Sequence, residues 1–212
     1  MLSSRIKPLP ITTMRFPIPA FALLLSLSAC APIIKAPPET MMAAHIKSLT
    51  QEQRAAMLAR VEKEAKGFSV GAGSPNRAWV FFDPACSYCS DLWRETMQLK
   101  DQVEFVWIPV ALLGDDGAML GAATLDSADP GSLMSANEAA MRKSGTMLTL
   151  TEEPSEASVS TVNSNTELLI TLDPGYRPVS VPLMYYRSSG GQIAIIDGTM
   201  EARVLKAAMK LK

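Results

Sequence analysis

The chain has 212 residues, of which 48% are hydrophobic and 19% charged, and its formal net charge is −1. This length and composition suit one folded domain with extensions, and the absence of an internal repeat argues against a solenoid or array. No concentration of basic residues marks a nucleic-acid-binding surface, so we expect no nucleic-acid partner.

Residues 1–29 predict an export signal of the lipoprotein type. They contain three basic residues, no acidic residue and an apolar run over residues 20–25 that is too short to span a bilayer. The run leads into LSAC, ending at Cys30, which resembles a bacterial lipobox, a signal in which the cysteine is acylated and becomes the mature N-terminus. The alternative is cleavage nearby, which leaves Cys30 as a free thiol. Removal of the signal leaves 17 basic against 21 acidic residues, a net charge of about −4.

Residues 30–76 are expected to form a tether and an N-terminal helix. Three prolines between residues 32 and 38 favour an extended tether. Thr50 and Gln53 make a capping box that predicts the start of a helix, and Gly67 marks its end. His45, just before this helix, is a lone histidine that we expect at the surface.

Residues 77–212 alternate between strand and helix patterns. Strands are expected at residues 77–83, 102–110, 181–186 and 192–196. Helices are expected after residue 86, twice within residues 119–141, at residues 166–172 and at residues 201–211. Residues 142–160, rich in Ser, Thr and Glu, are expected to be a loop, and the methionines of residues 119–141 are expected to fill the core. This order predicts an α/β fold with helices covering one small sheet.

Two cysteines, Cys86 and Cys89, lie where the first of these strands gives way to a helix. A helix N-terminus offers unpaired amide hydrogens and the positive end of the helix dipole, and both favour a thiolate over a thiol. Cys86 is therefore the candidate nucleophile. Cys89 follows about one helical turn later and can form a disulfide with Cys86. The pair can cycle between dithiol and disulfide, a reaction that needs no metal and no organic cofactor.

A cysteine pair can also serve other purposes. A structural disulfide that closes so short a loop contributes only about 2 kcal/mol in the chain-entropy estimate. A zinc site needs two more soft ligands, for which the chain offers only Cys30 and His45. A c-type haem site needs a histidine directly after the second cysteine, where Ser90 stands. A redox pair accounts for the two residues best.

The segment FFDPACSYCSDLW, residues 81–93, resembles the active-site stretch of the DsbC/DsbG family of periplasmic thiol:disulfide interchange proteins, and the DsbG branch fits best. Further agreement follows at residues 107–113, 129–137, 165–169 and 181–186. The resemblance implies a thioredoxin-like fold with a helical insertion over residues 77–212, preceded by the N-terminal helical extension. It also implies that Pro182 is a cis-proline facing the cysteines, and that the backbone of Val181 binds an extended client segment. Tyr88 and Trp93 would either shape an apolar surface for the client or serve in packing.

By this resemblance, the chain is a periplasmic thiol:disulfide oxidoreductase, anchored to the outer or inner membrane by a lipidated Cys30. It would act as a reductase or isomerase on disulfides or sulfenic acids of cysteine-containing envelope proteins, and a membrane reductant of the DsbD type would recharge it. Two positions differ from the usual pattern: Ser87 stands where the family has proline, and Val181 stands where this branch has threonine and the oxidase DsbA has valine. The residues before Trp79 are also too few and too helical for the family's dimerisation domain. A DsbA-like net oxidase and a thioredoxin-fold accessory of a secretion or conjugation apparatus are the alternatives.

Overall fold

The computed structural model of the chain describes residues 41–71, 73–175, 179–188 and 190–211. The predicted export signal, the tether and the lipidation site at Cys30 lie outside the described residues, and they stay predictions. Within the described part of the chain, no helix is both long enough and apolar enough to cross a membrane.

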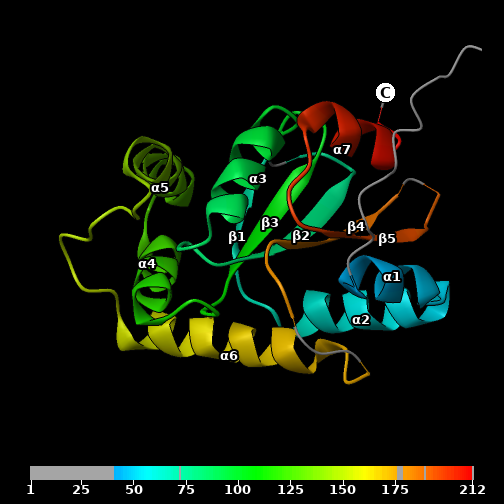
Figure 1. The fold of residues 1–212 in the computed structure, drawn as a ribbon, viewed down its shortest axis with the longest axis horizontal. Helices are drawn as coiled ribbons and strands as arrows, with labels where there is room; N and C mark the ends of the chain where they lie inside the picture. The colour runs from blue at the N-terminus through cyan, green and yellow to red at the C-terminus, as the bar shows by residue number, and fades with distance from the viewer. Residues whose placement is uncertain (1–40, 72, 176–178, 189, 212) are drawn as a thin grey trace, which may run out of the picture. The chain divides into compact units, whose positions relative to one another are not determined.

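Five strands form one mixed sheet in the order β1-β3-β2-β4-β5 (Figure 1). Their bounds are Phe68–Val70 for β1, Arg77–Phe82 for β2, Glu104–Pro109 for β3, Leu183–Arg187 for β4 and Ile193–Asp197 for β5. The neighbours β2 and β3 are parallel, because helix α3 (Ser87–Met97) connects them, and the other neighbouring strands are antiparallel. Four strands confirm the sequence prediction. The pattern does not predict β1, because three residues are too few to show a period.

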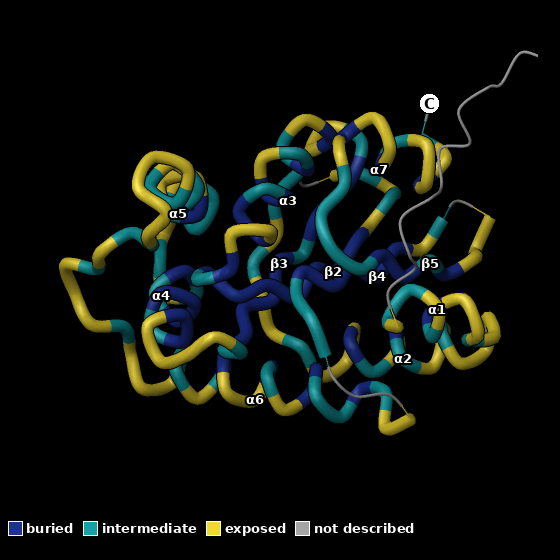
Figure 2. The backbone as a smooth tube through the Cα atoms, viewed as in Figure 1, coloured by how far each residue is buried: buried dark blue, intermediate teal, exposed yellow. Residues whose placement is uncertain are grey.

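Helices cover both faces of this sheet (Figure 1). Helices α3 and α7 (Ala202–Ala208) pack on one face, while α1 (Met41–Ser48), α2 (Gln51–Glu64) and α6 (Glu156–Leu172) pack on the other. Successive side chains of β2 point alternately into the two resulting cores: Val80 and Phe82 lie in the first, and Trp79 and Phe81 in the second. Strand β2 is buried on both sides from Ala78 to Phe82 (Figure 2), which explains why these residues form an apolar run.

Two helices, α4 (Asp115–Asp126) and α5 (Pro130–Ser144), follow β3, as predicted. The break between them arises because the Asp129 side chain accepts a hydrogen bond from the amide of Ser132 and Pro130 occupies the first turn of α5. Helix α4 packs on α6, whereas α5 packs chiefly on α3 and α4. The prediction that both helices cover the sheet is therefore wrong for α5, which extends the fold sideways (Figure 1).

The loop predicted at residues 142–160 is shorter, because α5 continues to residue 144 and α6 already starts at residue 156, whereas the helix predicted at residues 166–172 is confirmed as the end of α6. Helix α6 begins at Glu156, where Ser155 caps it by accepting a hydrogen bond from the amide of Ser158. The Ser and Thr residues of this segment are poor helix formers and gave no strong helical signal. Burial of Val162 and Leu169 against the rest of the fold stabilises the helix despite its composition.

The N-terminal helices agree with the sequence in one part and differ in another. Both hydrogen bonds of the capping box between Thr50 and Gln53 are present, so the predicted start of α2 is confirmed. Helix α1 is not predicted. It carries His45, whose Nε2 lies within hydrogen-bonding distance of the Asp173 carboxylate at the end of α6. His45 was expected at the surface; because α1 packs against the fold, its side chain is only partly exposed.

Candidate active site

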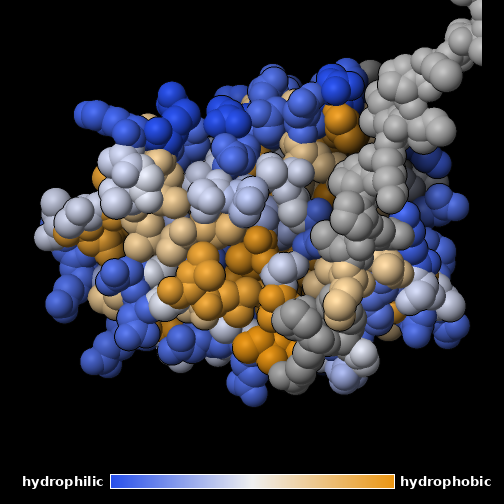
Figure 3. All heavy atoms as spheres, viewed as in Figure 1, coloured by the Kyte–Doolittle hydropathy of each residue, from blue (hydrophilic) through white to orange (hydrophobic). Residues whose placement is uncertain are grey.

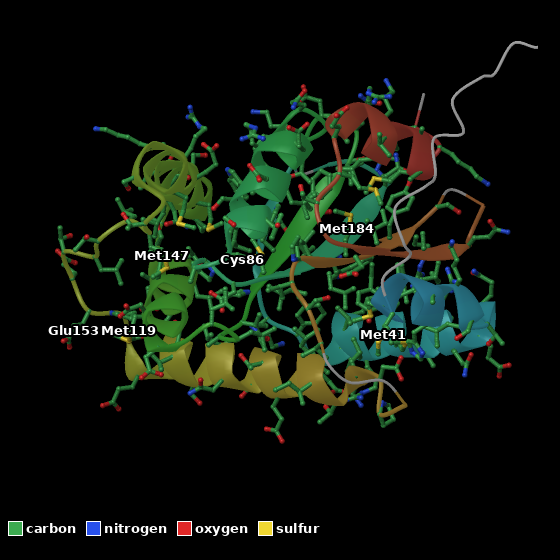
Figure 4. All side chains as sticks on the ribbon, viewed as in Figure 1. Met41, Cys86, Met119, Met147, Glu153 and Met184 are labelled. Carbon is green, nitrogen blue, oxygen red and sulfur yellow. The ribbon has the colours of Figure 1, made fainter. Side chains whose placement is uncertain are left out.

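The cysteine pair lies at the corner between β2 and α3. Cys86 is the residue that caps α3, with an extended backbone, and its amide donates a 2.9 Å hydrogen bond to the Asp83 carbonyl. The Cys86 carbonyl in turn accepts hydrogen bonds from the amides of Cys89 and Ser90. This arrangement confirms the predicted strand, turn and helix, and it places the sulfur of Cys86 against the first turn of α3 (Figure 4).

Both cysteines are free thiols and both are largely shielded from solvent. Cys86 is 7% exposed and Cys89 is 1% exposed. The two side chains are hydrogen-bonded to each other. On its other side, the Cys86 Sγ lies 3.6 Å from the carbonyl oxygen of Val181. An incoming group therefore meets the sulfur of Cys86 first, because Cys89 is the more deeply buried of the two cysteines.

The surroundings of Cys86 favour its thiolate. A hydrogen bond from Cys89 lowers the pKa of Cys86 most, burial opposes that effect, and the amides of Cys89 and Tyr88 lower the pKa further. The charge of Asp83 acts in the opposite direction, and the net result is a pKa of about 7. About half of the Cys86 side chains are then ionised at neutral pH, compared with about 3% for a free cysteine of pKa about 8.5.

The pKa of Cys89 is shifted in the opposite direction. Burial raises the pKa of Cys89 well above its usual value, and the hydrogen bond and the charge of Cys86 raise it further. Two neighbouring thiols with pKa values pushed apart can take different roles. The lowered pKa suits Cys86 to act as a nucleophile, and the raised pKa keeps Cys89 protonated at neutral pH.

A buried carboxylate, Asp83, holds this corner in place. It is fully buried, and it accepts hydrogen bonds from the amides of Ala85 (2.8 Å), Leu112 (2.7 Å) and Leu113 (2.8 Å). These bonds tie the active-site turn to the segment that follows β3. At Gly117 of α4 any side chain would overlap with the Asp83 carboxylate, so the helix approaches this closely only because that residue is glycine.

Two buried asparagines extend the same support. The Asn137 side chain of α5 donates to the Pro84 carbonyl (3.0 Å) and accepts from the Leu148 amide (2.9 Å), which joins the active-site turn to the loop after α5. Asn165 of α6 similarly bonds the backbone of Lys66 and Pro109. Sequence reasoning assigned no role to Asp83, Asn137 or Asn165. The available signal for Asp83 was a carboxylate directly after an apolar run, whereas Asn137 and Asn165 stand among other polar residues and gave no such signal.

Of the remaining predicted site residues, Val181 and Pro182 lie at Cys86, Tyr88 is exposed and Trp93 is buried. The Val181–Pro182 peptide bond is cis, as the resemblance implied, and Val181 contacts Cys86 through its carbonyl. Tyr88 is 63% exposed on α3, so its side chain faces solvent. Trp93 is instead buried and packs edge-on against Trp107, with ring centroids 5.0 Å apart. Trp93 therefore serves in packing.

No protein-family model matches this sequence, and no curated protein matches it either. Solved structures do. The catalytic domain of ScsC from Proteus mirabilis is 18% identical, with a TM-score of 0.57 over 74% of this chain and 96% of that domain. The thiol-disulfide exchange protein α-DsbA2 from Wolbachia pipientis is 16% identical, with a TM-score of 0.53 over 79% of this chain and 97% of that one. A periplasmic thioredoxin-like protein from Salmonella enterica serovar Typhimurium is 17% identical, with a TM-score of 0.50 over 76% of this chain and 96% of that one. The chain therefore has the thioredoxin-like fold with a helical insertion.

Proposed function

We propose that the protein is a periplasmic thiol:disulfide oxidoreductase that works through Cys86 and Cys89. The observation that carries this proposal is a Cys86 thiol with a pKa of about 7 at a helix N-terminus, with a second thiol hydrogen-bonded behind it. Structural cysteines buried in apolar surroundings have raised pKa values and are inert. The fold shared with exchange proteins supports the same reaction class.

In the reductive direction, the Cys86 thiolate attacks one sulfur of a client disulfide. The client S–S bond breaks, the second client sulfur leaves as a thiolate, and Cys86 is joined to the client as a mixed disulfide. With a client sulfenic acid the same attack expels hydroxide, which leaves as water after protonation. The Val181 carbonyl beside Cys86 and the neighbouring Pro182 and Tyr88 are the proposed contacts for the client backbone and side chains.

Resolution by Cys89 follows from its own environment. Formation of the mixed disulfide removes the negative charge of Cys86 and the hydrogen bond to it, and both had raised the pKa of Cys89. The pKa of Cys89 therefore falls at the stage where its thiolate is needed. Cys89 loses its proton and attacks the Cys86 Sγ, which releases the client as a thiolate. The client gains two electrons and, after protonation, two protons, while the cysteine pair becomes a disulfide.

A DsbG-like reductase or isomerase is the subtype we propose, on the resemblance of residues 81–93. Its oxidised pair would be reduced again by a membrane protein of the DsbD type, and its clients would be cysteine-containing envelope proteins. A lipid on Cys30 would hold it at the membrane. Val181 before the cis-proline favours a DsbA-like net oxidase as the second candidate, since the oxidase carries valine there. A non-enzymatic accessory of an envelope apparatus is the third.

Trapping of mixed disulfides tests this function. A Cys89→Ala variant can attack a client but cannot release it, so envelope proteins should accumulate on Cys86 and be released by reductant. The matched Cys86→Ala variant should trap none. Equal trapping by both variants, or by neither, would contradict the proposal. In the unaltered protein, a mainly dithiol state in cells supports the reductase and a mainly disulfide state supports the oxidase.

A further inference from the structure

The insertion forms a groove whose lining extends to the residue before Cys86. The hollow has a volume of about 640 Å³ and lies between α4, the end of α5 and the loop after it, and Ala85, the residue before Cys86, belongs to its lining. Volumes of this size are typical of sites that hold several side chains of a ligand. A polypeptide whose sulfur is attached to Cys86 can therefore lay its neighbouring residues in this groove.

The floor of the groove is apolar and adaptable. Its hydrophobic lining consists of Met119, Leu120, Met141, Met147, Leu148 and Leu150. Figure 4 shows Met119 and Met147 on the insertion side of Cys86. Methionine side chains are unbranched and polarisable and can adjust to differently shaped partners. Part of the methionine content of the insertion thus lines a surface, although Met134 is buried in the core as the sequence predicts.

Two further exposed apolar side chains lie near the turn between β2 and α3. Tyr88 and Leu113 are large hydrophobic residues that are 63% and 61% exposed, and they flank the segment tied together by Asp83. Figure 3 shows hydrophobic residues gathered around the middle of this face, with hydrophilic residues around the rim. Exposed apolar patches of this kind mark sites of contact with other proteins.

The charged residues of the groove have one sign. Asp116, Glu152 and Glu153 contribute carboxylates to the lining, and none of the described residues that line it is Lys or Arg. Glu152 and Glu153 lie next to each other on the exposed loop, where their charges reach an approaching partner. A surface of this sign attracts a partner of positive charge and speeds its association.

We propose that this groove selects extended client segments that carry apolar and basic side chains next to the reactive cysteine. The proposal rests on the proposed function and adds to it the class of client. The apolar floor takes a large side chain of the client, and the acidic loop pairs with a neighbouring Lys or Arg. Acidic segments approach the same sulfur more slowly because of repulsion from Glu152 and Glu153.

Two matched peptides test the proposal. Each carries one cysteine in a mixed disulfide with nitrothiobenzoate and the same leucines, and one has lysines where the other has glutamates. The Cys86 thiolate attacks the peptide sulfur and expels nitrothiobenzoate, whose absorbance gives the rate. At low salt we expect the basic peptide to react about tenfold faster than the acidic one. The ratio should fall towards one in about 0.5 M salt, where charges are screened.

Variants and a neutral reagent separate the possible outcomes. The double variant Glu152→Gln, Glu153→Gln should lose most of the preference, whereas Glu156→Gln, which removes an exposed carboxylate outside the groove lining, should keep it. A ratio near one in the unaltered protein, or one unaffected by the double variant, would overturn the proposal. The unaltered protein is also assayed with 2-hydroxyethyl disulfide, which is small and uncharged. Failure to react with this reagent would refute the proposed function itself, and self-association that the double variant abolishes would assign the groove to a second copy and overturn the proposal.

Discussion

Replacement of Asp83 by asparagine probes the support of the reactive corner. The carboxylate accepts three backbone hydrogen bonds, from Ala85 through one oxygen and from Leu112 and Leu113 through the other. Asparagine has one acceptor oxygen, so in its better orientation it keeps the two bonds to residues 112 and 113 and turns its NH₂ group towards the Ala85 amide. A buried unpaired N–H costs about 1–3 kcal/mol, and two charge-assisted bonds become neutral at about 1 kcal/mol each. Relief from burying a charge offsets part of this cost, so we expect Asp83→Asn to lose about 3 kcal/mol of stability.

The free energy of unfolding in urea measures this loss, with Asp101→Asn, at an exposed position, as the control that should change stability by less than about 0.5 kcal/mol. Asp83→Asn also tests a second, independent prediction. Because the charge of Asp83 raises the pKa of Cys86, its removal should lower that pKa below about 7. A stability like that of the control, together with an unchanged or higher Cys86 pKa, would refute the assigned role of Asp83.

Three further predictions concern the cysteines and Asn137. Cys89→Ala removes the hydrogen bond that lowers the pKa of Cys86 most. A hydrogen bond to a charged group contributes about 1.5–3 kcal/mol, so the pKa of Cys86 should rise by about 1–2 units, whereas Cys89→Ser keeps a donor and should raise this pKa less. Equal pKa values for Cys86 in the alkylation profiles of the two variants would contradict this. Asn137→Ala leaves the Pro84 carbonyl and the Leu148 amide without their hydrogen-bond partner. We expect the free energy of unfolding in urea to fall by about 2–3 kcal/mol and the Leu148 amide to exchange its hydrogen faster. An unchanged exchange rate at Leu148 would contradict the role of Asn137 in joining these two segments. Since the folded pKa of Cys86 lies below its unfolded value, its stabilising contribution is present above about pH 8.5 and lost as pH falls through about 7. The reduced protein should therefore gain about 1.6 kcal/mol over Cys86→Ser between pH 6 and 8.5, and a flat or falling difference would disprove this.

The corner around Cys86 could be predicted from the sequence because each of its parts is encoded locally. The apolar run of β2, the turn at Asp83 and Pro84 and the apolar spacing of α3 all lie within residues 77–99. The spacing of Cys86 and Cys89 needs only the geometry of one helical turn. The contact with residue 181 came from the resemblance, because no local pattern joins residues so far apart.

The polar ties of the site could not be predicted, because their partners are distant in the sequence. Asp83 reaches amides 29 and 30 residues away, and Asn137 reaches a carbonyl 53 residues away. The sequence predicts only the last part of helix α6, at residues 166–172. Its first part was missed for a related reason, since its stability comes from packing against α4 rather than from its Ser- and Thr-rich composition. The groove near Cys86 likewise depends on how α4, α5 and the loop after α5 pack against one another.

The rate of alkylation of the reduced protein by iodoacetamide, measured against pH with the modified residue identified by mass spectrometry, tests most directly whether Cys86 is the reactive thiolate. We predict that the label appears on Cys86 with a midpoint near pH 7, and that Cys89 stays unlabelled over the same range. A midpoint at or above about 8.5, the value of a free cysteine, or labelling of Cys89 first, would contradict the assignment of Cys86 as the nucleophile.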